Sequence, residues 1–263
     1  MYVIGDDEYD LGVFTVSGGA PGEMRPVLEV DDDDKPDVEA LTALPPFDGA
    51  PYGALLGLGS GSKPTRDTGF AWELAAEGSL GGDPQTIDLH PLYERLRGEI
   101  EELNVEGAAV LGEALWLFHR GNGADSSNAI VEVALDEAMR SLREEATIDV
   151  DDIRRVREYE LGELGGTALS FSDATALSDE LIVFTASAEA EEGGIHGSVV
   201  GTVGGDGSVE RLRTIDRRWK VEGVHAAIDT GVIDFVFVCD QDSDEASPLL
   251  SATMPADAAL ERG

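Results

Sequence analysis

The sequence contains very little lysine and almost no cysteine. Among 263 residues there is one cysteine, Cys239, and only three lysines, Lys35, Lys63 and Lys220. A single cysteine excludes an intrachain disulfide. Because phosphate binding needs clustered lysine and arginine, the shortage of basic residues also argues against a nucleic-acid partner. We expect Cys239, which lies in an apolar run, to be a small buried hydrophobe.

Long apolar runs are also missing. No segment approaches the roughly 18 to 20 apolar residues of a membrane span, and the first ten residues lack the basic and apolar regions of a secretory signal. We therefore expect a soluble, cytoplasmic protein with no membrane partner. Since 42% of the residues are hydrophobic, the chain can form a sizeable core, and we expect a single domain over residues 1–263.

Acidic residues dominate the charge. There are 54 Asp and Glu against 18 Lys and Arg, which gives a formal net charge of -36. Such a surface repels itself in dilute salt, because the Debye length is about 10 Å at 0.1 M and about 3 Å at 1 M. The composition resembles that of cytoplasmic proteins from organisms that accumulate salt, so we expect a halophilic, salt-adapted protein.

Short runs of Val, Leu, Ile and Phe recur along the chain, separated by Gly, Asp and Ser. This pattern is typical of β-strands joined by turns. Two segments differ, because residues 91–103 and 135–145 carry apolar side chains three or four positions apart, which predicts amphipathic helices. The sequence therefore predicts an all-β protein with short helical insertions.

One short motif occurs four times. Each copy places an acid before a small residue at the start of an apolar strand, and the four acids are Glu39, Glu106, Asp173 and Glu222. Two further strands follow each copy. The acids are 67, 67 and 49 residues apart, and the two longer intervals contain the predicted helices. Repeats of about 40 to 50 residues are typical of β-propellers.

The N-terminus joins this series one strand late, at Tyr2. We therefore predict a five-bladed β-propeller in which the first blade lacks its innermost strand and the last blade its outermost strand. A β-sandwich or a pair of β domains is the alternative architecture, because the number of strands also permits it.

Several segments resemble the signatures of an uncharacterised prokaryotic propeller-like family. They are KPDVEAL (35–41), LLGLGSGSKPTR (55–66), LNVEGAAV with FHRGN (103–122), FSDATAL (171–177) and KVEG (220–223). The resemblance covers nearly the whole chain and implies a fold but no activity. More distantly, the acids at the heads of the inner strands resemble those of five-bladed calcium-activated nucleotidases (apyrases) and of esterase-like and phytase-like propellers. In those nucleotidases inner-strand residues bind calcium on the ring axis; this chain lacks their phosphate-handling motifs.

The four acids predict a cation site. Because the innermost strands of a propeller line its central channel, we expect Glu39, Glu106, Asp173 and Glu222 to converge on one axis. Two carboxylates about 4 Å apart repel by about 4 kcal/mol at an effective dielectric of about 20, so a cation is bound or protons are taken up. Oxygen ligands suit a hard divalent cation, and a wide ring suits calcium better than magnesium. We therefore expect calcium, with magnesium or another hard divalent cation as the alternative. The alternative is that each acid is a surface carboxylate at the start of its strand.

Polar residues follow the second strands, where the loops of a propeller rim bind ligands. Those expected to bind a small anionic ligand are Ser60, Ser62, Arg66 and Asn122, and those expected to be catalytic in an enzyme are Arg120, Glu189 and Asp240. Arg120 either clamps a carboxylate or phosphate through both its NH₂ groups or forms an internal salt bridge with one of the many acids.

The sequence leaves two functions open. In the first, the protein is a non-enzymatic propeller whose axial ion is structural and whose rim binds a ligand. In the second, it is a metal-dependent hydrolase of a small phosphate ester, nucleotide or lactone. There the metal activates water, Glu189 or Asp240 is the general base, and Arg120 holds the anion. The sequence has no P-loop and no GxSxG elbow, and it does not indicate an oligomeric state.

Overall fold

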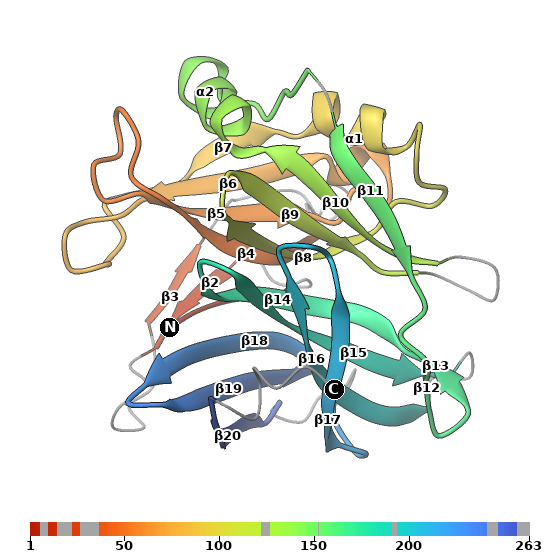
Figure 1. Cartoon of the computed structure of the whole chain (residues 1–263). Helices are drawn as coiled ribbons and strands as arrows, with labels where there is room; N and C mark the ends of the chain where they lie inside the picture. The colour runs from red at the N-terminus through yellow and green to blue at the C-terminus, as the bar shows by residue number, and fades with distance from the viewer. Residues whose placement is uncertain are drawn as a thin grey trace. The chain divides into compact units, whose positions relative to one another are not determined.

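The structure is a computed structural model that describes residues 1–5, 10–14, 23–26, 37–121, 127–151, 153–190, 194–240 and 247–256. Most of its regular elements are β-strands (Figure 1). Within each sheet the strands follow one another in chain order, so each sheet is a simple meander. The all-β prediction is confirmed. The contacts divide the chain into two compact units: unit 1 comprises residues 1–105 and 132–155, and unit 2 comprises residues 106–131 and 156–263.

Unit 1 begins with a three-stranded sheet of β1 (Tyr2–Ile4), β2 (Asp10–Val13) and β3 (Glu23–Pro26). A four-stranded sheet follows, formed by β4 (Val38–Leu44), β5 (Ala54–Gly59), β6 (Thr68–Glu73) and β7 (Gln85–Asp88). A short 3-10 helix, Pro64–Arg66, lies between β5 and β6. Leu11, Phe70 and Trp72 pack in one apolar cluster with Val38 and Leu55.

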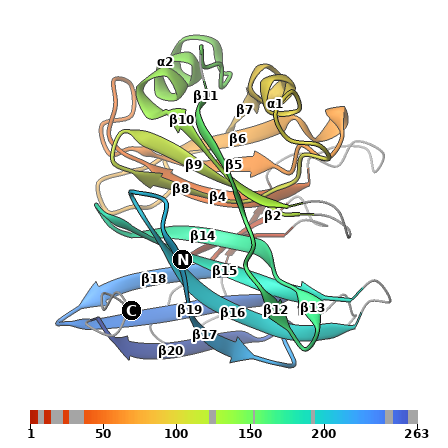
Figure 2. The ribbon, with the colours of Figure 1, turned by 45° about the vertical axis from the view of Figure 1, so that its right-hand side comes forward.

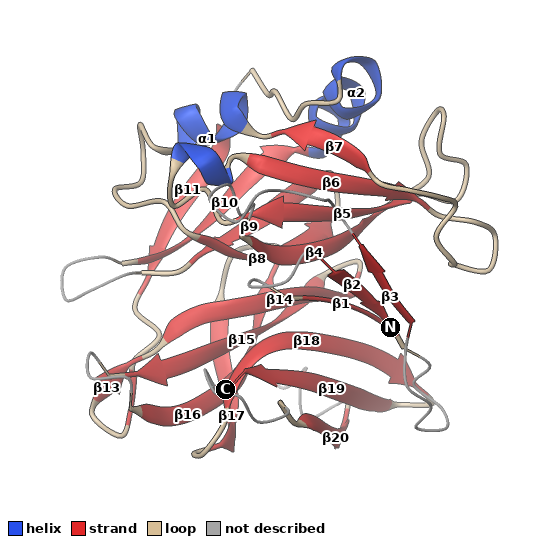
Figure 3. Ribbon diagram, turned by 180° about the vertical axis from the view of Figure 1, so that it is seen from behind, coloured by secondary structure: helices blue, strands red, loops and turns tan. Residues whose placement is uncertain are grey.

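Both α-helices belong to unit 1 (Figure 3). α1 (His90–Leu96) buries Leu92 and Leu96, and it ends before the predicted residue 103 because the chain turns at Gly98. α2 (Leu135–Glu145) has the predicted bounds, and Ala146 ends it in the left-handed conformation with φ 53°. The prediction of short helical insertions is therefore confirmed.

A second four-stranded sheet contains β8 (Val105–Leu111), β9 (Ala114–His119), β10 (Asn128–Ala134) and β11 (Ile153–Tyr159). In unit 2 a two-stranded ribbon of β12 (Glu163–Leu164) and β13 (Thr167–Ala168) precedes a third four-stranded sheet. That sheet contains β14 (Ser170–Ser178), β15 (Leu181–Glu189), β16 (Ile195–Gly204) and β17 (Val209–Asp216). The last sheet has three strands, β18 (Lys220–Asp229), β19 (Val232–Asp240) and β20 (Leu249–Pro255) (Figure 2).

Three phenylalanines fix the core of unit 2. Phe171 on β14 meets Phe118 of β9 and Phe184 of β15 edge to face, with ring centroids 5.1 Å apart in both pairs. This geometry favours the positive edge of one ring against the negative face of the next. Phe118 lies two residues before Arg120, so the packing of β9 against β14 also positions that arginine.

The sheets are those of a β-propeller with four blades among the residues that the structure describes. The predicted fifth blade is not confirmed. Both terminal sheets have three strands among the residues that the structure describes. Which strand each terminal blade lacks stays a prediction. The prediction of a single domain over residues 1–263 stays a prediction.

Candidate functional site

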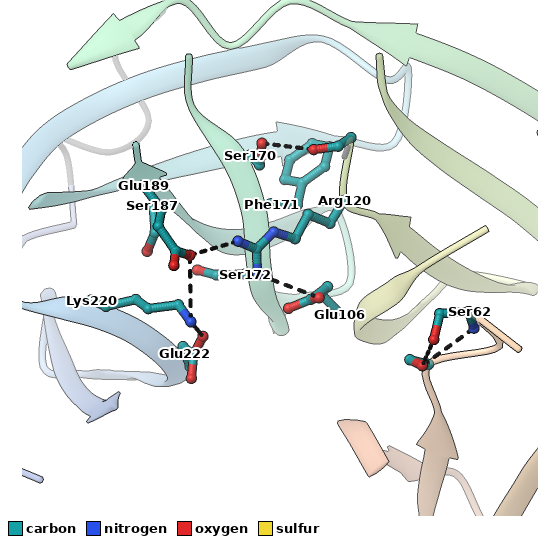
Figure 4. A network of polar contacts seen from close by, with 12 residues as sticks. Ser62, Glu106, Arg120, Ser170, Phe171, Ser172, Ser187, Glu189, Lys220 and Glu222 are labelled. Atoms are coloured by element: carbon teal, nitrogen blue, oxygen red, sulfur yellow. Dashed lines mark hydrogen bonds and ion pairs between the residues drawn. The ribbon is translucent and has the colours of Figure 1, made fainter. Parts of the chain in front are cut away.

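Five charged side chains meet at strand ends of unit 2 (Figure 4). Glu106 lies on β8, Arg120 directly follows β9, Glu189 ends β15, and Lys220 and Glu222 lie at the start of β18. We call these five residues the charge network. They come from four strands that lie far apart in the sequence, so the fold of unit 2 assembles them.

Two cations hold three carboxylates together in the charge network. Arg120 donates from Nη2 to Oε2 of Glu189 at 2.9 Å, and its Nη1 lies 3.5 Å from Oε1 of Glu106. Nζ of Lys220 lies 2.6 Å from Oε1 of Glu222 and 3.6 Å from Oε2 of Glu189. The side chains of Glu189 and Glu222 are 26% and 22% exposed, so solvent and small ions reach the network.

Burial and neighbouring charges both shift the pKa values of the network. Burial raises the pKa of Glu222 to about 7, and the charges of Glu106 and Asp240 add to this effect while Lys220 opposes it. Burial alone would lower the pKa of Lys220, but Glu222 and Glu189 raise it overall. The pKa of Arg120 is likewise raised, because Glu106 and Glu189 outweigh its burial. Both cations therefore stay charged, whereas Glu222 exchanges a proton near neutral pH.

Asp173 lies close to the network but has different partners. Its Oδ1 accepts a hydrogen bond from the backbone N–H of Ala174, and its Oδ2 accepts one from the N–H of Val224, both at 2.7 Å. Burial raises the pKa of Asp173 to about 8, helped by the charge of Glu106 and opposed by the two N–H donors. Asp173 thus joins β14 to β18.

The glycines that follow Glu106 and Glu222 have a packing role in unit 2. A Cβ on Gly107 would lie 2.8 Å from the backbone N of Ala174 and 2.9 Å from the carbonyl carbon of Asp173. A Cβ on Gly223 would meet Val238 at 3.1 Å. The acid-then-small motif therefore lets β8 approach β14 closely, while it brings Glu106 near Asp173.

Replacing Gly107 with alanine is expected to lower the free energy of unfolding by about 1 to 3 kcal/mol, because backbone atoms of β14 must move to admit the methyl group. Urea denaturation in molar KCl measures this loss. The matched control is Gly82→Ala, where the new Cβ meets no atom within 4 Å. Equal stability of the two variants would show that the close approach is not a constraint.

Register shifts occur at the motifs of β4, β14 and β18. The β4–β5 ladder shifts between Val38 and Ala40, so Glu39 is the extra residue, and the β18–β19 ladder shifts around Glu222 in the same way. In β14 the shift falls around Ser172, one residue before Asp173. A bulge changes the direction of the side chains next to it. The bulge includes Glu222 but lies one residue before Asp173, and the two acids have different partners.

The predicted ligand-binding residues of unit 1 form a second polar cluster. Asp37 is in the left-handed region with φ 51° and accepts a hydrogen bond from Oγ of Ser60 at 2.7 Å. Nη1 of Arg66 lies 2.6 Å from Oδ2 of Asp37 and donates to Oγ of Ser62 at 2.8 Å. Ser60, Ser62 and Arg66 are therefore brought together around an aspartate.

The other predicted site residues are placed as follows. Asp240 ends β19 opposite Lys220 in the ladder and acts electrostatically on Glu222. Glu39 lies on β4 in unit 1, so its position relative to the other three acids is not described. Asn122 lies outside the described residues. The contacts of Arg120 correspond to the internal salt bridge that the sequence left as one of two alternatives.

Sequence reasoning did not identify Lys220 as a member of the site. The available signal was its rarity, because it is one of three lysines and stands two residues before a motif acid. Residues two apart on a strand lie on one face. An acid-based search favoured a metal ion, whereas in the structure Lys220 and Arg120 contact the carboxylates.

No three His, Cys, Asp or Glu side chains within the described ranges are arranged as ligands of one metal ion. The predicted calcium site stays a prediction. The described part of the chain also has no helix long and apolar enough to cross a membrane.

The meander sheets define the class of protein: it is a β-propeller. The chain belongs to a family of unknown function, DUF6929, whose model matches residues 1–254. No curated protein sequence matches it. The distant likeness to calcium-activated nucleotidases stays a prediction.

Two enzymes are among the solved structures that are similar to the chain. An α-L-arabinofuranosidase from Podospora anserina, solved with cellotriose, has 12% sequence identity and a TM-score of 0.52 over 97% of this chain and 86% of its own. An apocarotenoid oxygenase from Synechocystis has 14% identity and a TM-score of 0.45 over 86% of this chain. The chain spans 47% of the length of that oxygenase. At these identities the likeness concerns the fold alone.

Proposed function

We propose that the protein is a cation-binding β-propeller, and that a hard divalent cation, calcium in the first place, binds at the carboxylates of the charge network. The observation that carries this proposal is the excess of carboxylates over cations. Three glutamates share Arg120 and Lys220, and the nearby Asp173 adds a fourth carboxyl group. Oxygen ligands of this kind suit calcium.

Binding of the cation is coupled to proton release. Glu222 and Asp173 hold protons near neutral pH, with pKa values raised to about 7 and about 8. A divalent cation favours their ionised forms and displaces those protons. The ion then replaces Lys220 at Glu222 and stabilises the strands that supply the ligands. We place this activity in a salt-rich cytoplasm, because the net charge of -36 favours molar salt.

Calcium is expected to raise the melting temperature. At a hundredfold excess over its dissociation constant the cation adds about 2.7 kcal/mol, which corresponds to about 5 to 10 °C for a chain of this size. The measurement compares calcium, magnesium and chelator at constant molar KCl. Glu222→Gln should lose the response. The matched control Asp234→Asn, an exposed acid on β19, should keep it.

The cation proposal fails if neither metal nor chelator moves the melting temperature by more than about a degree. A second readout is the pH of a weakly buffered solution near pH 7, which should fall when calcium is added. A calcium response that Glu222→Gln leaves intact would place the ion elsewhere in the protein.

A metal-dependent hydrolase is the second candidate. It is favoured by Glu222, an acid that titrates near neutral pH beside the ion pair of Arg120 and Glu189. An acid of this kind would donate a proton to a leaving group, and a metal held by the neighbouring carboxylates would supply the activation of the attacking water. A screen with chromogenic phosphate esters and lactones, run beside the melting experiment, separates the two candidates. Metal-dependent turnover that Glu106→Gln abolishes supports the hydrolase, and metal-dependent stability without turnover supports the binding protein.

A further inference from the structure

Among the described residues, β20 is the last strand of its sheet in unit 2. β20 pairs with β19 over the whole of Leu249–Pro255. Within the described part of the chain no strand pairs with its other side (Figure 2). In each of the three four-stranded sheets, by contrast, a fourth strand covers the third.

β20 has the composition of a covered strand. Its sequence, LLSATMP, contains no charged residue. The covered third strands β6, β10 and β16 are similar. β6 and β10 contain one acidic residue each, β16 contains none, and none of the three contains lysine or arginine. The strands that end their sheets, β11 and β17, carry both arginines and acids, and β7 ends with Asp88. Charges on an edge strand prevent pairing with other chains, and β20 lacks this protection.

The hydrogen bonds at the two ends of β20 show which residues face the open edge. Cys239 donates its N–H to the carbonyl of Pro248, and Ala256 donates its N–H to the carbonyl of Gly231. In an antiparallel ladder the bonded pairs alternate, so the even-numbered residues of β20 direct their backbone groups toward β19. Ser251 and Thr253 therefore direct their N–H and C=O groups outward.

We infer that this edge of β20 is the docking strand for β20 of a second copy of the chain, paired antiparallel about a two-fold axis. Centred on Ala252, the pairing sets Ser251 of each copy against Thr253 of the other, with Leu249 opposite Pro255. Both outward N–H groups then meet carbonyls. A chain with a net charge of -36 is repelled by its own surface, and an uncharged strand is where two such chains approach at least cost.

The pairing also covers exposed apolar surface. Leu249 is 59% exposed, although the chain has few large hydrophobic side chains as accessible as this one within its described ranges. Since seven residues per copy bury less area than the roughly 1,200 Å² of a standard interface, the dimer is weak. It strengthens with salt, because salt screens the repulsion between the two acidic bodies. This inference does not depend on cation binding.

Sedimentation of the full chain over a range of protein and KCl concentrations tests the inference. The wild type should move from monomer toward twice the monomer mass as KCl rises from about 0.1 M to about 1 M. Ser251→Pro removes one outward N–H and should weaken association at least tenfold, whereas Ser251→Thr keeps the N–H and should associate like the wild type. Thr253→Asp, which places a carboxylate on the edge, should act like Ser251→Pro.

Melting curves of the variants confirm that each is folded. In the ladder with β19, Ser251 and Thr253 occupy the pairs that exchange no backbone hydrogen bond, so these changes remove no hydrogen bond between β20 and β19. A monomer at every salt and protein concentration overturns the inference. So does a dimer that Ser251→Pro and Thr253→Asp both leave unchanged, or an assembly larger than a dimer.

Discussion

Replacing Arg120 with methionine is expected to lower the free energy of unfolding by about 3 kcal/mol at neutral pH, because it leaves two carboxylates without their shared cation. Arg120 contacts both Glu106 and Glu189, and the side chain of Glu106 is only 7% exposed. Methionine keeps most of the apolar volume of the arginine side chain. The loss of stability therefore comes from the missing charge and not from a cavity. Urea denaturation at constant molar KCl measures it.

The matched control is Arg218→Met. Arg218 pairs with Asp216 at 2.9 Å, but its side chain is 74% exposed, so the change should cost less than about 1 kcal/mol. Arg120→Lys, which keeps a charge but not two parallel donors, should fall between the wild type and Arg120→Met. In a double-mutant cycle, Glu189→Gln should recover part of the loss, because it removes one of the stranded charges. If Arg120→Met and Arg218→Met are equally stable, Arg120 is not the central counter-ion of the site.

The strand pattern and the repeat could be predicted from local sequence. Alternating apolar runs with glycine turns indicated the sheets, and the recurrence of acid and small residue located the starts of β4, β8, β14 and β18. Leu135, Met139 and Leu142 predicted α2 with its observed bounds. These features depend on residues close together in the chain, so periodicity reveals them.

The site depends on contacts between distant strands and on the exact position of each bulge, and the sequence predicted these features only in part. Shared spacing placed Asp173 and Glu222 in one role, but the register shift in β14 lies one residue earlier than the equivalent position in β18. A bulge has no clear sequence signature here, because the same acid-then-small pattern accompanies both arrangements. The ion pair of Lys220 and Glu189 joins two different sheets. No local sequence pattern indicates which cationic side chain will contact a given group of acids.

Raising the pH from about 6 to about 8 at constant molar KCl is expected to lower the free energy of unfolding by about 3 to 4 kcal/mol. Asp173 and Glu222 have pKa values raised from 3.8 to about 8 and from 4.5 to about 7. The unfolded chain has released both protons above about pH 5, whereas the folded chain keeps them until pH 7 to 8. Folding therefore takes up protons in this window, so stability is highest on its acid side and is lost as the pH rises.

Asp173→Asn should flatten this dependence. The asparagine has one acceptor oxygen for the two N–H groups of Ala174 and Val224, so the variant is less stable at every pH. The change in the free energy of unfolding with pH, and not its value at a single pH, is therefore the quantity to compare. His90, whose pKa Asp67 raises, contributes a slope of the same sign in this window, and burial of His225 gives the opposite sign. His90→Gln is the control, because it should leave most of the pH dependence of the free energy of unfolding in place. If that dependence is lost in His90→Gln and kept in Asp173→Asn, the titrating group is the histidine.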